Sequence, residues 1–125
     1  MRTFLGVAAA LAWLVGAMLL LAPGPFYAPI GIQLTPMMAT IAQAHGATLI
    51  GLGVVDWLAR GADRGGLIAV LGGNLVVQVL SLAIAVRTIL LVGGGGPAPA
   101  VLIHVVLGGF FAYFLAKATK GPAPS

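Results

Sequence analysis

The sequence predicts an all-α polytopic membrane protein, a single domain over residues 1–125 with four transmembrane helices in an antiparallel up-and-down bundle. Hydrophobic residues make up 61% of the chain and charged residues 6%, whereas a soluble domain carries about 25% charged residues. So few charges leave too little polar surface to face water. The apolar residues also gather into four runs, and a helix needs about 20 of them to cross a bilayer.

The first apolar run covers residues 4–22 and follows Arg2. A cleaved signal peptide is the alternative, but its apolar region is about 7–15 residues long and ends at a small-residue cleavage site. This run is longer and PGPFYAP follows it, so we expect a helix that is retained. Four prolines between residues 22 and 36 then predict a loop, because proline lacks an N–H and disfavours helix at the residue before it.

The other three runs predict helices over residues 35–60, 67–92 and 98–119. The polar turn GADRGG at 61–66 separates the second helix from the third, and glycines with proline at 93–97 separate the third from the fourth. The runs are too long for strands and show no period-two alternation, so a β architecture is excluded.

The basic residues predict the orientation of these helices. Five of them fall at one set of helix ends: Arg2, Arg60, Arg64, Lys117 and Lys120. Short loops that carry Lys and Arg stay in the cytoplasm. We therefore expect both termini on the cytoplasmic side (N-in, C-in) of a bacterial inner membrane, because an odd number of spans would divide these bases between the two sides.

Small residues at helical spacing are expected to mark the contacts between helices. Lipid is as apolar as leucine, so helices in a bilayer associate through close packing and interhelical hydrogen bonds. We assign packing roles to five small residues in three of the predicted helices: Ala42, Gly46, Gly53, Gly73 and Gly108.

Polar side chains inside the runs are the candidate ligand-binding residues: Gln43, His45, Asp56, Asn74, Gln78, Arg87 and His104. Asn74, Gln78 and Ser81 share one face of the third helix. A carboxamide in an apolar environment needs hydrogen-bond partners. That face is therefore expected to point to the bundle or to another subunit, through interhelical hydrogen bonds or, alternatively, through contact with a ligand.

Three charged residues lie near the ends of the second and third helices. Asp56 and Arg60 are one helical turn apart, which favours an ion pair at the membrane boundary. A proton or cation site at Asp56 is the alternative. Arg87 lies about one turn from the outer end of its helix, from which it can extend to the interface. An anionic lipid headgroup or a carboxylate of a partner subunit is the other interpretation of Arg87.

The two histidines, His45 and His104, fall in the same leaflet on different helices, roughly 14 and 9 Å deep at about 1.5 Å per residue. That placement is compatible with a haem b held by two imidazoles. Gly46 and Gly108 near them leave room for a macrocycle. Interhelical hydrogen bonding, to a carbonyl or to Gln43, is the simpler interpretation and the one we favour.

The run GATLIGLGVVDWLAR at 46–60 resembles the second helix of small uncharacterised bacterial four-helix membrane proteins of the DoxX-like kind. The residues that match their pattern are Gly46, Ala47, Leu49, Gly51, Gly53, Trp57, Leu58, Ala59 and Arg60. The pair Gly73–Asn74 and the segment FFAYFLAK at 110–117 are similar too. The resemblance implies a four-helix membrane fold and implies no activity.

Several kinds of chemistry are not expected of this chain. Nucleotide-binding, metalloprotease and hydrolase motifs are absent from the sequence, as is an obvious acid/base pair of carboxylates, so we do not expect an enzyme. The absence of cysteine excludes thiolate metal ligands, and no metal site is predicted. The six bases are dispersed, so no nucleic-acid partner is expected.

The favoured function is a structural or accessory subunit of a larger membrane complex. Its partners are then the lipid bilayer and other membrane subunits, or further copies of the chain. The second class is a binder of an apolar or redox ligand within the bundle, such as haem, quinone or carotenoid. The third class is a minimal oligomeric transporter or channel that uses Asp56 or the pair Asn74 and Gln78.

Overall fold

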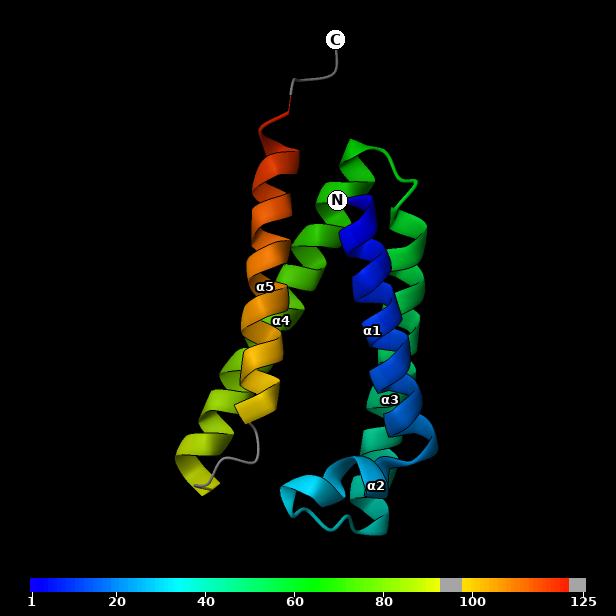
Figure 1. Ribbon diagram of the computed structural model, residues 1–125, viewed down its shortest axis with the longest axis vertical. Coiled ribbons are helices and arrows are strands. Elements are labelled where there is room, and N and C mark those ends of the chain that lie inside the picture. Colours follow the sequence, from blue (N-terminus) through cyan, green and yellow to red (C-terminus); the bar gives the residue numbers. More distant parts are fainter. Residues whose placement is uncertain (93–97, 122–125) are drawn as a thin grey trace. The chain divides into compact units, whose positions relative to one another are not determined.

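The computed structural model describes residues 1–92 and 98–121, and its regular elements in these ranges are all helices. Four helices are long and apolar enough to cross a membrane: α1 (Arg2–Leu21), α3 (Pro36–Ala59), α4 (Arg64–Val92) and α5 (Ala98–Thr119). Two short helices, α2 (Pro23–Tyr27) and the 3₁₀ helix η1 (Ala28–Ile30), lie between α1 and α3 (Figure 1). The prediction of an all-α chain with four long apolar helices is confirmed over the described residues.

The chain divides into two compact units, Met1–Gly61 and Ala62–Ser125. In the first unit α1 packs against α3, and in the second unit α4 packs against α5. Each of these pairs is antiparallel: Gly6 near the start of α1 lies beside Arg60 after α3, and Arg64 at the start of α4 contacts Ala118 near the end of α5. Each unit is therefore a helical hairpin.

The proline-rich segment between α1 and α3 differs from the predicted loop, because residues 23–30 form two short helices. Pro23 is the first residue of α2, and Pro29 is in the first turn of η1. Proline is tolerated there because the first N–H groups of a helix have no intrahelical acceptor. Gly31 follows with φ of 76°, a left-handed conformation that glycine adopts readily and that ends the helix.

Capping residues account for where α3 and α4 begin. Thr35 precedes α3, and its hydroxyl oxygen accepts a hydrogen bond from the Met38 N–H at 3.3 Å. The carboxylate of Asp63 accepts a hydrogen bond from the Gly66 N–H at 2.7 Å. Helix α4 therefore begins at Arg64, three residues before the predicted start, because Asp63 in the expected turn serves as its cap. The predicted breaker at 93–97 lies outside the described residues.

Glycines set the close approach of α1 and α3. A Cβ atom on Gly46 would stand 2.6 Å from the Gly16 carbonyl oxygen and 2.7 Å from the Leu20 nitrogen. A Cβ atom on Gly53 would stand 2.6 Å from the Trp13 ring and 3.0 Å from the Ala9 carbonyl oxygen. Both glycines are buried, and the nearest atoms belong to α1, so a side chain at either position would force α1 or the Trp13 ring to shift.

The small residues chosen from the sequence differ in their surroundings. Ala42 is buried, with 6% of its surface exposed. A Cβ atom on Gly108 would meet the Gln78 Cβ at 3.4 Å, an ordinary van der Waals distance between α5 and α4. Gly73 has no described atom within 4 Å of a Cβ position, apart from its own helix. The packing role expected of Gly73 is thus not seen among the described residues.

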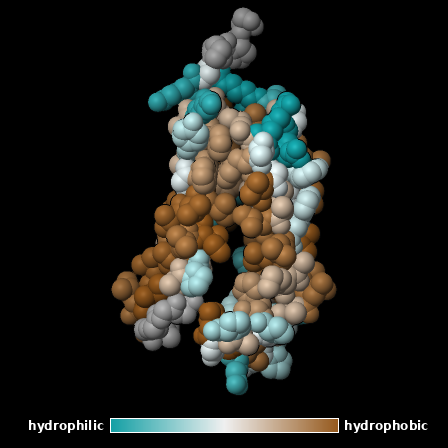
Figure 2. All heavy atoms as spheres, viewed as in Figure 1, coloured by the Kyte–Doolittle hydropathy of each residue, from teal (hydrophilic) through white to brown (hydrophobic). Residues whose placement is uncertain are grey.

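Apolar side chains cover most of the length of the long helices, and hydrophilic residues gather near helix ends (Figure 2). Many large apolar side chains are exposed on every long helix, including Leu14 at 60%, Leu58 at 70% and Leu90 at 78%. In water this amount of exposed apolar surface would be unfavourable, whereas in lipid it is solvated.

Candidate functional site

The central polar contact of the second unit joins α4 to α5. The Nδ1 atom of His104 lies 2.7 Å from the Oε1 atom of Gln78. A carboxamide oxygen can only accept a hydrogen bond, so this contact places the imidazole proton on Nδ1. Gln78 is buried, with 7% of its surface exposed. Two residues that the sequence singled out separately are therefore brought together as one interhelical pair.

The predicted polar stripe lies on the face of α4 that carries this pair. Asn74 is buried, with 2% of its surface exposed, and its Nδ2 atom donates to the Val70 carbonyl oxygen at 3.1 Å. Ser81 is half-buried. Because both carboxamides are buried, the stripe faces protein rather than an open surface.

The end of α5 is capped by Arg64, which the sequence indicates only as an orientation charge. The Nε atom of Arg64 donates to the Ala118 carbonyl oxygen at 2.9 Å, and its Nη2 atom donates to the Thr119 carbonyl oxygen at 2.8 Å. The last carbonyls of a helix have no intrahelical donor, and a cation beside them also interacts favourably with the helix dipole. Arg64 thus joins the start of α4 to the end of α5.

These two contacts fix one register along the second hairpin. Fourteen residues separate Arg64 from Gln78 on α4, and fourteen separate His104 from Ala118 on α5. Equal spacing on antiparallel helices means that both contacts belong to a single alignment of the pair. A change at either contact is therefore expected to act on the same hairpin.

Replacing Arg64 with methionine is expected to destabilise the α4–α5 hairpin by about 1 kcal/mol, because two hydrogen bonds from a charged donor are lost at a partly exposed site. Denaturant unfolding in detergent measures the loss. The matched control is Lys117→Met, which removes an exposed cation from the same helix end. Equal losses in the two variants would show that charge alone, rather than capping, is responsible.

Arg60 makes an aromatic contact that the sequence did not predict, and its predicted ion pair with Asp56 stays a prediction. The Arg60 guanidinium carbon lies 4.1 Å from the centre of the Trp57 ring, a cation–π contact. Trp57 in turn lies against Trp13 of α1, with ring centres 5.6 Å apart. Asp56 is buried, with 1% of its surface exposed. Arg60 therefore continues an aromatic stack across α1 and α3, an arrangement that sequence spacing did not indicate.

The remaining candidates of the first unit, Gln43 and His45, are exposed side chains of α3. The Nε2 atom of Gln43 donates to the Leu20 carbonyl oxygen at 3.2 Å, close to the end of α1. His45 and His104 belong to different units. The bis-histidine haem b interpretation stays a prediction. His104 does bond between helices, but to Gln78 and not to either partner named from the sequence, a carbonyl or Gln43.

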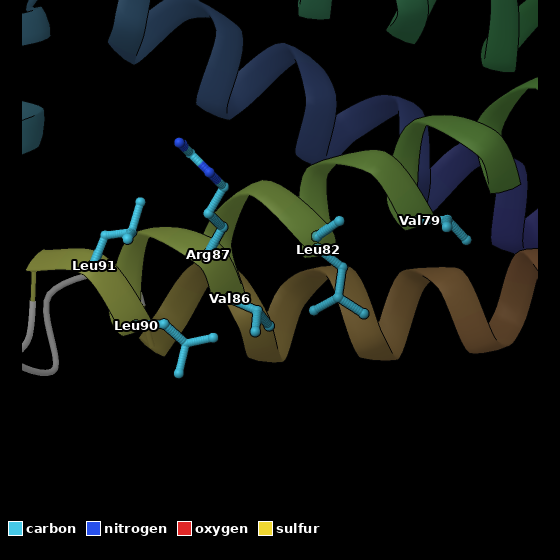
Figure 3. A pocket seen from close by; sticks show the side chains of 7 residues that line it. Val79, Leu82, Val86, Arg87, Leu90 and Leu91 are labelled. Carbon is cyan, nitrogen blue, oxygen red and sulfur yellow. The ribbon is translucent and has the colours of Figure 1, made fainter.

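Arg87 lies in a shallow apolar groove on α4 (Figure 3). The seven residues that line this α4 groove are Val79, Leu82, Ala83, Val86, Arg87, Leu90 and Leu91. Arg87 is exposed and is the one charged residue among them. It makes no hydrogen bond, ion pair or ring contact with another described residue.

Within the described parts of the chain, no group of three or more His, Asp or Glu side chains is arranged to hold a metal ion. Comparison of the chain with family models, with curated proteins and with solved structures finds no match. The resemblance to DoxX-like proteins therefore stays a prediction.

Proposed function

We propose that this chain is a multi-pass protein of the bacterial inner membrane that serves as a structural or accessory subunit of a larger membrane complex. Four apolar helices of spanning length support the membrane location. The resemblance of 46–60 to DoxX-like proteins agrees with a four-helix membrane fold. The hydrogen bonds that the polar side chains make within the hairpins support the accessory role.

The observation that carries the proposal is that these polar groups bond within the hairpins. Gln78 contacts His104, Gln43 binds the Leu20 carbonyl, and Arg64 binds the carbonyls at the end of α5. Groups engaged in this way hold helices together in lipid, where a polar group without a partner is costly. Most of the other exposed residues on the long helices are apolar, glycine or alanine, which suits contact with lipid and with neighbouring helices.

The charges support an orientation with both termini in the cytoplasm. Arg2 and Arg60 lie at one end of the first hairpin, and Arg64, Lys117 and Lys120 lie at one end of the second. Both ends adjoin the short connection between α3 and α4. Lys and Arg in short loops are retained in the cytoplasm, so this connection is proposed to be cytoplasmic.

Reporter fusions test the orientation directly. A reporter that is active only in the cytoplasm is expected to give signal when it is fused after Gly61 or after Gly121. A reporter that is active only after export is expected to give signal after Gly31, in the connection between α1 and α3. Export activity at Gly61 would contradict the proposed orientation.

Purification in mild detergent, with native mass and absorption measured together, tests the accessory role. Different membrane proteins that copurify in fixed ratio are expected. A colourless assembly of this chain alone that conducts ions in liposomes would favour the transporter or channel. An absorption band that follows the protein would favour a haem, quinone or carotenoid ligand instead.

A further inference from the structure

The α4 groove carries one charged residue, Arg87, and it lies on a different face of the helix from the contact with α5. The face with Gln78 packs against α5, and the groove is turned from it by roughly a third of the helix circumference, at about 3.6 residues per turn. The groove is thus separate from the interhelical contacts described above. All of its lining residues come from α4 (Figure 3).

The length of the groove corresponds to one leaflet. Val79 and Leu91 are twelve residues apart, which is roughly 18 Å along a helix that rises about 1.5 Å per residue. One leaflet accounts for about half of a hydrocarbon core that is about 30 Å thick. A single extended apolar chain can therefore lie along the groove from the interface toward the middle of the bilayer.

The charge of the groove indicates which headgroup the bound molecule carries. Arg87 lies five residues before Val92, the last residue of α4, and from there a long side chain reaches the headgroup region. Its guanidinium is exposed and has no described protein partner. A planar guanidinium binds phosphate oxygens in a bidentate manner and with more directional hydrogen bonds than an ammonium group.

We infer that the α4 groove binds an anionic phospholipid, with the phosphate-containing headgroup on Arg87 and one acyl chain along Val79, Leu82 and Val86. The charge complementarity and the length of the apolar surface favour this occupant over a second copy of the chain, which offers few carboxylates: the sequence holds two acidic residues, of which Asp56 is buried and Asp63 caps α4. The inference rests on the membrane location within the proposed function and is independent of the accessory role.

The test is lipid competition on the full-length protein in detergent. The protein is offered equal amounts of phosphatidylglycerol and phosphatidylcholine with identical acyl chains, and native mass spectrometry measures the ratio of the bound lipids. Wild type is expected to prefer phosphatidylglycerol by about fivefold, the effect of one basic residue near the membrane surface. Arg87→Gln is expected to abolish the preference, and Arg87→Lys is expected to retain part of it.

Two controls separate the headgroup contact from other effects. Lys117→Gln removes an exposed cation outside the groove and is expected to leave the preference unchanged. Ala83→Phe fills the groove and is expected to lower the amount of both bound lipids, whereas Ala69→Phe on another exposed part of α4 is not.

An equal ratio of the two lipids on wild type, or an unchanged preference in Arg87→Gln, overturns the inference. A dimer that forms through the groove and excludes both lipids overturns it as well. Recovery of the chain in the soluble fraction of cells would instead contradict the proposed membrane location, so the two failures are distinguishable.

Discussion

Replacing Gly46 with alanine is expected to separate α1 from α3 and to lower the stability of the first hairpin by about 1–3 kcal/mol, the usual cost of overpacking. The new methyl group would lie 2.6 Å from the Gly16 carbonyl oxygen and 2.7 Å from the Leu20 nitrogen. Both are backbone atoms, so neither moves without shifting α1. Thermal unfolding in detergent, followed by circular dichroism, measures the loss.

Gly51 provides a matched control on the same helix. No described atom lies within 4 Å of a Cβ position on Gly51, and the residue is exposed. Alanine is favoured over glycine in helices by about 1 kcal/mol, so Gly51→Ala is expected to be neutral or stabilising. If Gly46→Ala behaves like Gly51→Ala, α1 and α3 do not depend on this close approach.

The four long helices could be predicted from the sequence because their signal is local. Run length and composition alone determine whether a segment can span a bilayer, and the predicted fourth helix at 98–119 coincides with α5. The errors fall where capping or proline position decides. Asp63 extends α4 toward its N-terminus by accepting a hydrogen bond, and Pro23 begins a helix in the segment expected to be a loop.

The candidate site was less predictable because it depends on the register between helices. Gln78 and His104 each stood out as a polar residue in an apolar run, but twenty-six positions separate them in the sequence. Neither apolar run indicates which residue of α4 faces which residue of α5. The sequence indicates Arg64 only as an orientation charge, because capping of a helix by a residue on its neighbour has no local pattern.

The aromatic stack was missed for the same reason. Trp57 and Arg60 are three residues apart, which places them as neighbours on α3, but the spacing of Asp56 and Arg60 suggested a different pair. Trp13 belongs to another helix and reaches Trp57 because Gly53 leaves room beside it. A small residue on one helix thus determines where a large residue on the other can lie.

A double-mutant cycle on Gln78 and His104 is expected to show strong coupling between the two side chains. Gln78→Leu removes the oxygen that the His104 Nδ1 proton faces, and His104→Leu removes the donor that faces the Gln78 oxygen. Each single variant is expected to lose about 1–2 kcal/mol of unfolding free energy, because a polar group that loses a hydrogen bond in an apolar environment carries a desolvation cost. Unfolding of all four proteins in detergent measures the cycle.

The double variant is expected to lose less than the sum of the single variants, by about 0.6 kcal/mol on the average measured for interhelical pairs in a membrane protein and by at most about 1.7 kcal/mol. In the double variant both side chains are apolar and lie in an apolar environment. In each single variant the remaining polar side chain stays in that environment without this contact, which is less favourable. Thr88→Val is the control, because its hydroxyl donates to the Ile84 carbonyl of its own helix at 2.9 Å. Additive losses from Gln78→Leu and His104→Leu would mean that the two side chains stabilise the hairpin separately, and the pairing of α4 with α5 would then depend on apolar packing and on Arg64.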